Sequence, residues 1–166
     1  MDDQRVKRVA RYLSHRKVLK WRFCFDSKSN EKIKVYTDSD WAGDISSRRS
    51  TSGGILCYAG CVIKTWSTLQ KLNALSSAEA EYLAMIKGVQ EAMALQTLLQ
   101  ELGLKATITV HTDSSAAKAS AEKPGLMHMK HMQLRELFLK QVVQEGLVVI
   151  EKVNTLVNPA DMLQNQ

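Results

Sequence analysis

The segment VYTDSDWAGD, residues 35–44, gathers carboxylates in a chain that is otherwise basic. Asp38, Asp40 and Asp44 fall within seven positions, although the whole sequence holds 23 Lys and Arg against 17 Asp and Glu. Carboxylates that lie close together repel one another, so a cluster of them is tolerated where cations neutralise it. The alternative is a solvated loop in which aspartates shape a turn. This segment therefore indicates either a metal site or a polar turn.

Four acids stand at the ends or beginnings of predicted elements and form the candidate site. Asp38 and Asp113 each follow an apolar run that predicts a strand. Glu81 lies in the opening turns of a long predicted helix, and Asp161 in the first turn of a short terminal one. Sheets build sites from residues at the ends of their elements, so the four acids could converge at one edge. Oxygen ligands select magnesium or manganese over zinc or copper, and two such ions about 4 Å apart would suit hydrolysis of a phosphodiester.

Helix geometry separates Glu81 from its neighbour Glu79. Ser76 and Glu79 are spaced as a capping box, which occupies Glu79 at the helix start. The two glutamates are two positions apart and cannot share a helix face. Glu81 lies on the predicted sheet-facing side, where a carboxylate without a ligand would be costly. Asp161 has a simpler alternative role, because an acid in the first turn of a helix complements the helix dipole.

Hydrophobic periodicity predicts the elements that carry these acids. A basic amphipathic helix is expected from about residue 4 to 15, and a largely buried helix runs from the cap at Ser76 to Leu102. Strands are predicted at 21–25, 32–37, 53–60, 61–67, 107–112 and 147–153, with further helices at 114–122 and 132–145 and a short one after Asn158-Pro159. The early strands form an antiparallel meander. The later alternation indicates a mixed sheet with helices packed on its faces.

The composition sets limits on the class of protein. A chain of 166 residues with 45% hydrophobic content is expected to form one domain with a proper core. The formal charge of +6 favours a polyanionic partner such as nucleic acid, and ordinary solubility explains it equally well. Three cysteines without a second metal-binding pair argue against a disulfide framework or a zinc site and favour a reducing compartment, the cytoplasm. No apolar run is long enough to span a bilayer, so no membrane partner is expected.

The motifs VYTDSDWAGD, RRSTSGG, ALSSAEAEYLAM, HTDSSAA and NPADML occur in this order. Over roughly residues 32–163 they resemble the ribonuclease H domain at the end of the polyprotein of copia-type LTR retrotransposons. The resemblance implies an α/β, ribonuclease H-like fold: a mixed five-stranded sheet, an antiparallel meander plus parallel strands, with helices on both faces. KRVARYL resembles the tail of the adjoining reverse transcriptase. Residues 1–25 are therefore expected to be a remnant of that module and residues 26–166 the ribonuclease H domain.

The resemblance also implies an activity and a site. Such a domain cuts the RNA strand of RNA:DNA hybrids during reverse transcription, leaving a 3′-hydroxyl and a 5′-phosphate, with two Mg²⁺ ions that Mn²⁺ can replace. The family's four catalytic, metal-binding acids match Asp38, Glu81, Asp113 and Asp161. Asp40 and Asp44 fall in the loop after the first of them. The implied partners are the hybrid and the reverse transcriptase module of the same polyprotein, inside a virus-like particle if the element is active.

Basic and hydroxyl-bearing residues flank the acids and suit contacts with phosphates. Such contacts set affinity and register rather than sequence preference. The candidates are Arg48, Arg49, Ser50, Thr51, Lys64, Ser67, Gln70 and Lys71. For each of them, a solvated surface position is the alternative interpretation.

The sequence departs from the family pattern at three places. NTLVNPAD lacks the histidine that relatives carry before the last aspartate, Gln133 replaces the acid of a K-H-I-D motif in which His131 is the histidine, and ADMLQNQ replaces A-D-x-L-T-K. These departures leave a catalytically weakened, hybrid-binding module as an alternative. A third hypothesis is an integrase or transposase, because those enzymes build three-acid clusters on the same fold.

Overall fold

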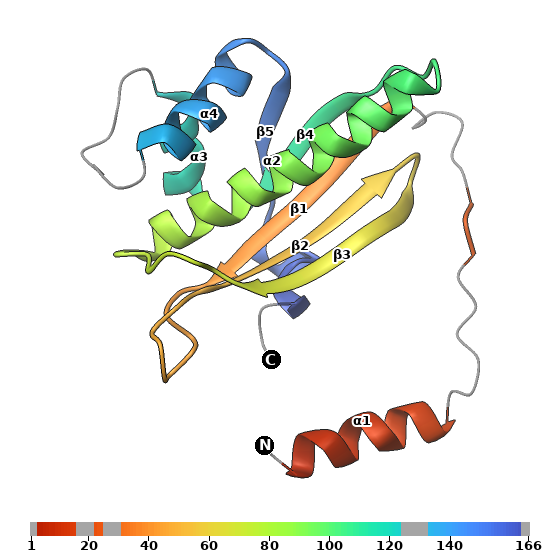
Figure 1. Ribbon diagram of the computed structural model, residues 1–166, viewed down its shortest axis with the longest axis vertical. Helices are drawn as coiled ribbons and strands as arrows, with labels where there is room; N and C mark the ends of the chain where they lie inside the picture. Colours follow the sequence, from red (N-terminus) through yellow and green to blue (C-terminus); the bar gives the residue numbers. More distant parts are fainter. Residues whose placement is uncertain (1–2, 16–21, 25–30, 124–132, 164–166) are drawn as a thin grey trace.

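The computed structural model describes residues 3–15, 22–24, 31–123 and 133–163 (Figure 1). Its elements, in chain order, are α1 (Asp3–His15), β1 (Lys32–Asp40), β2 (Thr51–Tyr58), β3 (Cys61–Leu69), α2 (Ser77–Glu101), β4 (Thr107–Thr112), α3 (Ser115–Glu122), α4 (Gln133–Gln144), β5 (Val148–Lys152) and the 3₁₀ turns η1 (Thr155–Val157) and η2 (Asp161–Leu163). Within these described ranges, no helix is both long and apolar enough to cross a membrane.

The five strands form one mixed sheet in the order β3-β2-β1-β4-β5. β1, β2 and β3 pair antiparallel as a meander, whereas β1, β4 and β5 pair parallel. The predicted fold class is thereby confirmed. Because β1 and β4 are parallel neighbours, their carboxyl ends emerge side by side at one edge of the sheet.

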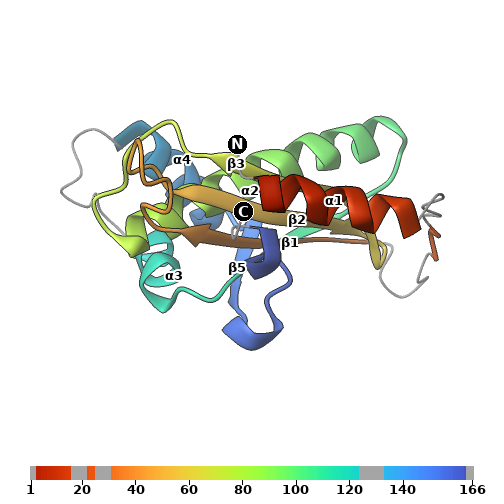
Figure 2. The same cartoon turned by 90° about the horizontal axis from the view of Figure 1, so that it is seen from below.

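The two faces of the sheet are covered by different elements. Val35 and Thr37 of β1 are fully buried and face α2, since a Cβ added at Gly88 of that helix would lie 2.6 Å from Thr37 Cγ2. On the other face, a Cβ added at Gly53 would lie 2.9 Å from the carbonyl oxygen of Ala160, just before η2. Figure 2 shows α2 and the C-terminal turns on opposite sides of the sheet. The close approach of α2 to β1 brings the helix start to the end of that strand.

The start of α2 follows the predicted cap with one change. The Ser76 hydroxyl accepts a hydrogen bond from the Glu79 N–H at 3.2 Å, as expected for an N-cap. The Glu79 carboxylate accepts from the N–H of Leu75 at 2.8 Å, one residue before the cap. Glu79 is therefore occupied at the helix terminus, as predicted, and Glu81 lies in the next turn.

Two predicted elements differ from the structure. Residues 22–24 are not in a strand, and the ends of the predicted strand at 21 and 25 lie outside the described residues. Phe23 is exposed there, so no burial of its ring drives strand pairing. The predicted terminal helix is the single 3₁₀ turn η2, preceded by η1. The Asn158 side chain does accept from the N–H of Ala160, at 3.2 Å, and η2 spans Asp161–Leu163 at the end of the described residues.

Gly88→Ala is expected to destabilise the protein, although alanine is the better helix former. Alanine is favoured over glycine in a helix interior by about 1 kcal/mol. A methyl group at this position would meet the fully buried side chains of Thr37 and Val35 at 2.6 and 3.0 Å. Overpacking of that kind costs about 1–3 kcal/mol and would push α2 away from β1. Thermal denaturation checks this: a melting temperature equal to or above that of the wild type would contradict it.

Candidate active site

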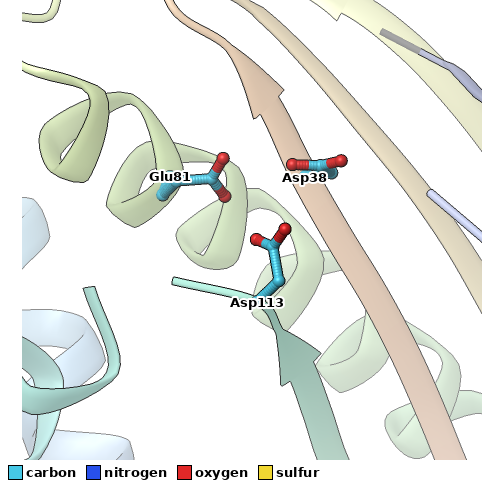
Figure 3. A group of neighbouring side chains, drawn as sticks. All are labelled: Asp38, Glu81 and Asp113. Atoms are coloured by element: carbon cyan, nitrogen blue, oxygen red, sulfur yellow. The ribbon is translucent and has the colours of Figure 1, made fainter. Parts of the chain in front are cut away.

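Three of the four predicted acids meet where β1, β4 and α2 come together (Figure 3). Asp38 lies near the carboxyl end of β1, Asp113 directly follows β4, and Glu81 extends from the second turn of α2. Each contributes one carboxylate oxygen to a group in which all such atoms lie within 4.8 Å of one another. Asp38 and Glu81 are buried, and Asp113 is partly exposed. The cluster is thus open to solvent on the side of Asp113.

One backbone donor joins two of the carboxylates. The N–H of Ser39 donates to Asp38 Oδ1 at 2.8 Å and to Glu81 Oε1 at 3.0 Å. The second oxygen of Glu81 is buried and has no hydrogen-bond partner within the part of the chain that the structure describes. A buried carboxylate oxygen without a donor is costly unless a cation or a proton satisfies it.

Burial and mutual repulsion favour the protonated forms of Glu81 and Asp38. Burial, followed by the charge of Asp38, raises the pKa of Glu81 to about 9. Burial also raises the pKa of Asp38 to about 6; the neighbouring Glu81 side chain opposes this shift, and the charge of Asp113 adds to it. The protein therefore concentrates more carboxylates than it can ionise at neutral pH without a cation. An all-oxygen donor set with an unpaired buried oxygen fits a divalent ion such as Mg²⁺ or Mn²⁺.

The fourth predicted acid, Asp161, opens η2 on the other face of the sheet. It lies outside the group of oxygens within 4.8 Å, and its charge is a small contributor to the raised pKa of Asp38. Buried Asn158 holds this segment in place, because its Nδ2 donates to the carbonyl oxygen of Thr37 at 3.1 Å. Thr37 immediately precedes Asp38, so Asn158 ties the segment of Asp161 to the strand of Asp38.

Asn158→Ala is expected to reduce the free energy of unfolding by about 1–3 kcal/mol. The substitution removes a buried donor to Thr37 and the acceptor for the N–H of Ala160. Asn154→Ala is the matched control, since Asn154 caps η1 in the same way through the N–H of Leu156 but is exposed. Urea denaturation should show a smaller loss for Asn154→Ala. Equal decreases in the free energy of unfolding for the two variants would mean that the bond from Asn158 to Thr37 does not contribute to stability.

The other two aspartates of VYTDSDWAGD lie outside the cluster: Asp44 is in the loop after β1, as predicted, whereas Asp40 is the last residue of the strand itself, paired with β2. The Asp44 carboxylate accepts hydrogen bonds from the Ser46 hydroxyl and the Ser47 N–H, both at 3.1 Å, and from the Ser47 hydroxyl. These bonds lower the pKa of Asp44 and shape the turn, which confirms its predicted turn-forming role. The side chain of Asp40 lies against the α-carbon of Gly43.

The predicted phosphate contacts divide into exposed and buried residues. Arg48, Arg49 and Lys71 are exposed, and Ser67 lies in register with Gly53 and hence with Asp38 across the sheet. Thr51 is partly buried opposite Asp40, and Lys64 forms an ion pair with Glu91 at 2.6 Å. The other two, Ser50 and Gln70, are buried.

The two buried residues have internal partners. The Ser50 hydroxyl accepts from the N–H of Ala42 at 3.1 Å. The side-chain amide of Gln70 lies among acceptors from three elements, the nearest being Ser52 Oγ at 2.8 Å. In this conformation neither side chain is available to a duplex.

Two side chains outside the cluster make contacts that the sequence did not predict. Trp41 is half-exposed, and its indole N–H donates to the carbonyl oxygen of Ala74 at 3.1 Å, which joins the loop after β1 to the loop before α2. His111 stacks on Tyr36, with ring centroids 4.6 Å apart, and burial lowers its pKa. In the sequence, the only feature that could have drawn attention to His111 is its position two residues before Asp113. His131 lies outside the described residues.

Comparison with known proteins shows which sequences this chain resembles. No protein-family model matches the chain. It is 38% identical over 143 residues to the retrovirus-related Pol polyprotein from transposon TNT 1-94 of Nicotiana tabacum, covering 84% of this chain and 11% of that one. It is 32% identical over 170 residues to the retrovirus-related Pol polyprotein from transposon RE1 of Arabidopsis thaliana, covering 96% of this chain and 11% of that one. The chain thus spans about a tenth of the length of these relatives.

Solved structures agree with the fold. LC11-RNase H1, isolated from compost, matches with a TM-score of 0.62 and 18% identity, over 81% of this chain and 94% of that one. The same protein in complex with RNA/DNA hybrid matches with a TM-score of 0.60 and 18% identity, over 80% and 94% of the two chains. The fold is therefore that of ribonuclease H domains. The homologues of the chain are retrovirus-related Pol polyproteins from transposons, as the sequence motifs predicted.

Proposed function

We propose that this chain is the ribonuclease H domain of a copia-type retrotransposon polyprotein and hydrolyses the RNA strand of RNA:DNA hybrids during reverse transcription. The observation that carries the proposal is the meeting of Asp38, Glu81 and Asp113 within 4.8 Å on a ribonuclease H fold. Asp161, which opens η2 outside this group, is proposed as the fourth acid. The products are an RNA 3′-hydroxyl and a 5′-phosphate.

The three clustered acids would hold divalent ions, Mg²⁺ or Mn²⁺, with Asp161 completing the set. Bound as a pair, such ions supply an activated water and neutralise the charge that develops on the phosphate. The protein itself fixes the geometry: the N–H of Ser39 orients both Asp38 and Glu81. Burial of these two carboxylates keeps bulk water from competing for their oxygens.

The hybrid is favoured as substrate by charge and by the fold. The chain carries a formal charge of +6, and Arg48, Arg49 and Lys71 are exposed on the loops that follow β1 and β3. Phosphate contacts of this kind give salt-dependent affinity without sequence preference. The ribose 2′-hydroxyl is the group by which a site distinguishes RNA from DNA. LC11-RNase H1, with the same fold, has been solved with an RNA/DNA hybrid bound.

The N-terminal segment, residues 1–25, is proposed to be the end of the adjoining reverse transcriptase module. α1 carries Val6, Val9, Tyr12 and Leu13, each more than half exposed. An exposed apolar stripe on an amphipathic helix suits packing against another module. Both relatives described above are Pol polyproteins, much longer than this chain.

A labelled hybrid tests the proposal directly. With Mg²⁺, the purified chain should cut the RNA strand, leave the DNA strand intact and not cut a DNA duplex of the same sequence. Salt-sensitive binding without turnover above an Asp38→Asn control, in both Mg²⁺ and Mn²⁺, would instead identify a hybrid-binding module. A DNA strand-transfer product would identify an integrase-like enzyme.

A further inference from the structure

Gln70 follows β3 and is buried beside the acidic cluster, at 8% exposure. Its backbone N–H donates to the carbonyl oxygen of Ser50 at 2.7 Å, which fixes the main chain against the start of β2. The side chain is thereby directed inward, between the sheet and the start of α2.

The amide group of Gln70 connects three elements. Its Nε2 lies 2.8 Å from Ser52 Oγ of β2, 2.9 Å from the carbonyl oxygen of Ala80 in α2, and 3.2 Å from Ser39 Oγ of β1. An amide nitrogen has two hydrogens, so these three acceptors share them. One side chain thus holds β1, β2 and α2 at a common point.

The residues that Gln70 holds are the immediate neighbours of the clustered acids. Ala80 precedes Glu81, and Ser39 follows Asp38. The N–H of Ser39 also donates to both carboxylates. A shift of either neighbour would change the separation of the two carboxylates, and a misplacement of about 1 Å can cost about a hundredfold in rate.

The acceptor end of the same amide argues against a role in stability alone. Gln70 Oε1 is buried and has no hydrogen-bond partner among the described residues. An unpaired buried acceptor costs about 1–3 kcal/mol, and replacing such a group by an apolar side chain of the same shape can be neutral or stabilising. The donor end therefore accounts for a glutamine at this place.

We infer that Gln70 is a positioning residue that sets the separation of Asp38 and Glu81 through Ser39 and Ala80. This inference rests on the proposed function, because it gives the amide a role in the same cluster. It also replaces the predicted phosphate contact of Gln70 with an internal one.

Gln70→Met tests the inference, since methionine keeps the length and shape of the side chain and removes its donors. The expected result is a fall of at least about tenfold in kcat on the hybrid, with KM within about twofold of the wild type. Calorimetry should show affinity for Mg²⁺ reduced several-fold in the absence of substrate. The matched control is Gln96→Met, because the amide of Gln96 also donates to a backbone carbonyl, that of Ala106 at 2.7 Å, away from the cluster.

The control separates positioning from packing. Wild-type kcat and Mg²⁺ affinity in folded Gln70→Met protein, or equal losses in Gln96→Met, would overturn the inference. If Gln70→Met does not fold, Gln70→Asn serves in its place: it keeps an amide too short to reach all three elements, and the same two outcomes decide. If the wild type itself does not cut the hybrid, the proposed function fails, whereas the comparison of Mg²⁺ affinities still decides the role of Gln70.

Discussion

Asp38→Asn is expected to reduce Mg²⁺-dependent cleavage of the RNA strand by at least about a thousandfold, equivalent to about 4 kcal/mol of transition-state stabilisation. The reason is geometric. Asp38 is buried at the end of β1 and shares the N–H of Ser39 with Glu81, so an amide at this position removes a charge from the centre of the cluster. Single-turnover cleavage of a labelled hybrid measures the effect.

The same substitution is expected to stabilise the metal-free protein. Burial and the neighbouring acids raise the pKa of Asp38, which means that its charge is disfavoured in the folded state. Removing that charge relieves the repulsion, so the free energy of unfolding in a chelator should rise while activity is lost. A structural defect would lower both the free energy of unfolding and the activity. A rise in the first with a loss of the second therefore identifies a functional carboxylate.

Asp40→Asn provides the matched control for Asp38→Asn. It makes the same chemical change two residues further along, where the side chain lies against Gly43 and outside the cluster. Cleavage by this variant should stay within about threefold of the wild type. Wild-type cleavage by Asp38→Asn, or equal losses in both variants, would show that the site is assigned to the wrong aspartate.

The parts of the site that the sequence predicts are those fixed by local pattern. Asp38 and Asp113 end apolar runs, and parallel pairing of β1 with β4 then brings their strand ends together. Glu81 was separated from Glu79 by the capping box, and the structure keeps that distinction. These predictions hold because strand ends and helix caps depend on residues a few positions apart.

The parts that it does not predict depend on contacts between distant segments. Gln70 is polar and close to basic residues, so its sequence context suggested a phosphate contact. Only the packing of three elements shows that its amide is buried among Ser39, Ser52 and Ala80. The bond from Asn158 to Thr37 joins residues 121 positions apart. Local pattern predicts a polar role for Asn158 at the start of the last turn, and its side chain does accept from the N–H of Ala160, but that pattern could not show the bond to Thr37.

The metal-free protein is expected to lose stability as the pH rises towards the pKa of Glu81. Burial and Asp38 raise that pKa from 4.5 to about 9, so between these values the folded protein binds more protons than the unfolded chain. Stability then falls with increasing pH, by up to about 1.4 kcal/mol per pH unit for one proton. Asp38 adds to the fall at lower pH, since its pKa rises from 3.8 to about 6.

The titration of other groups limits the pH range in which the contribution of Glu81 to stability can be measured. Burial lowers the pKa of His111 from 6.5, which gives the opposite slope below that pH. Burial raises the pKa of Cys57 from 9.0, which adds a slope of the same sign near that value. Urea denaturation in a chelator between about pH 7 and pH 8.5 therefore isolates Glu81 best.

Glu81→Gln should flatten this pH dependence, because the variant has no proton to lose at that position. Glu79→Gln is the control: its side chain bonds the N–H of Leu75 at the helix start, so this variant leaves the cluster and the slope in place. Mg²⁺ should restore the stability of the wild type most strongly at the upper end of the range, since the ion binds the deprotonated carboxylates. A wild-type slope that persists in Glu81→Gln would mean that another group binds the proton, and the assignment of Glu81 to the cluster would be wrong.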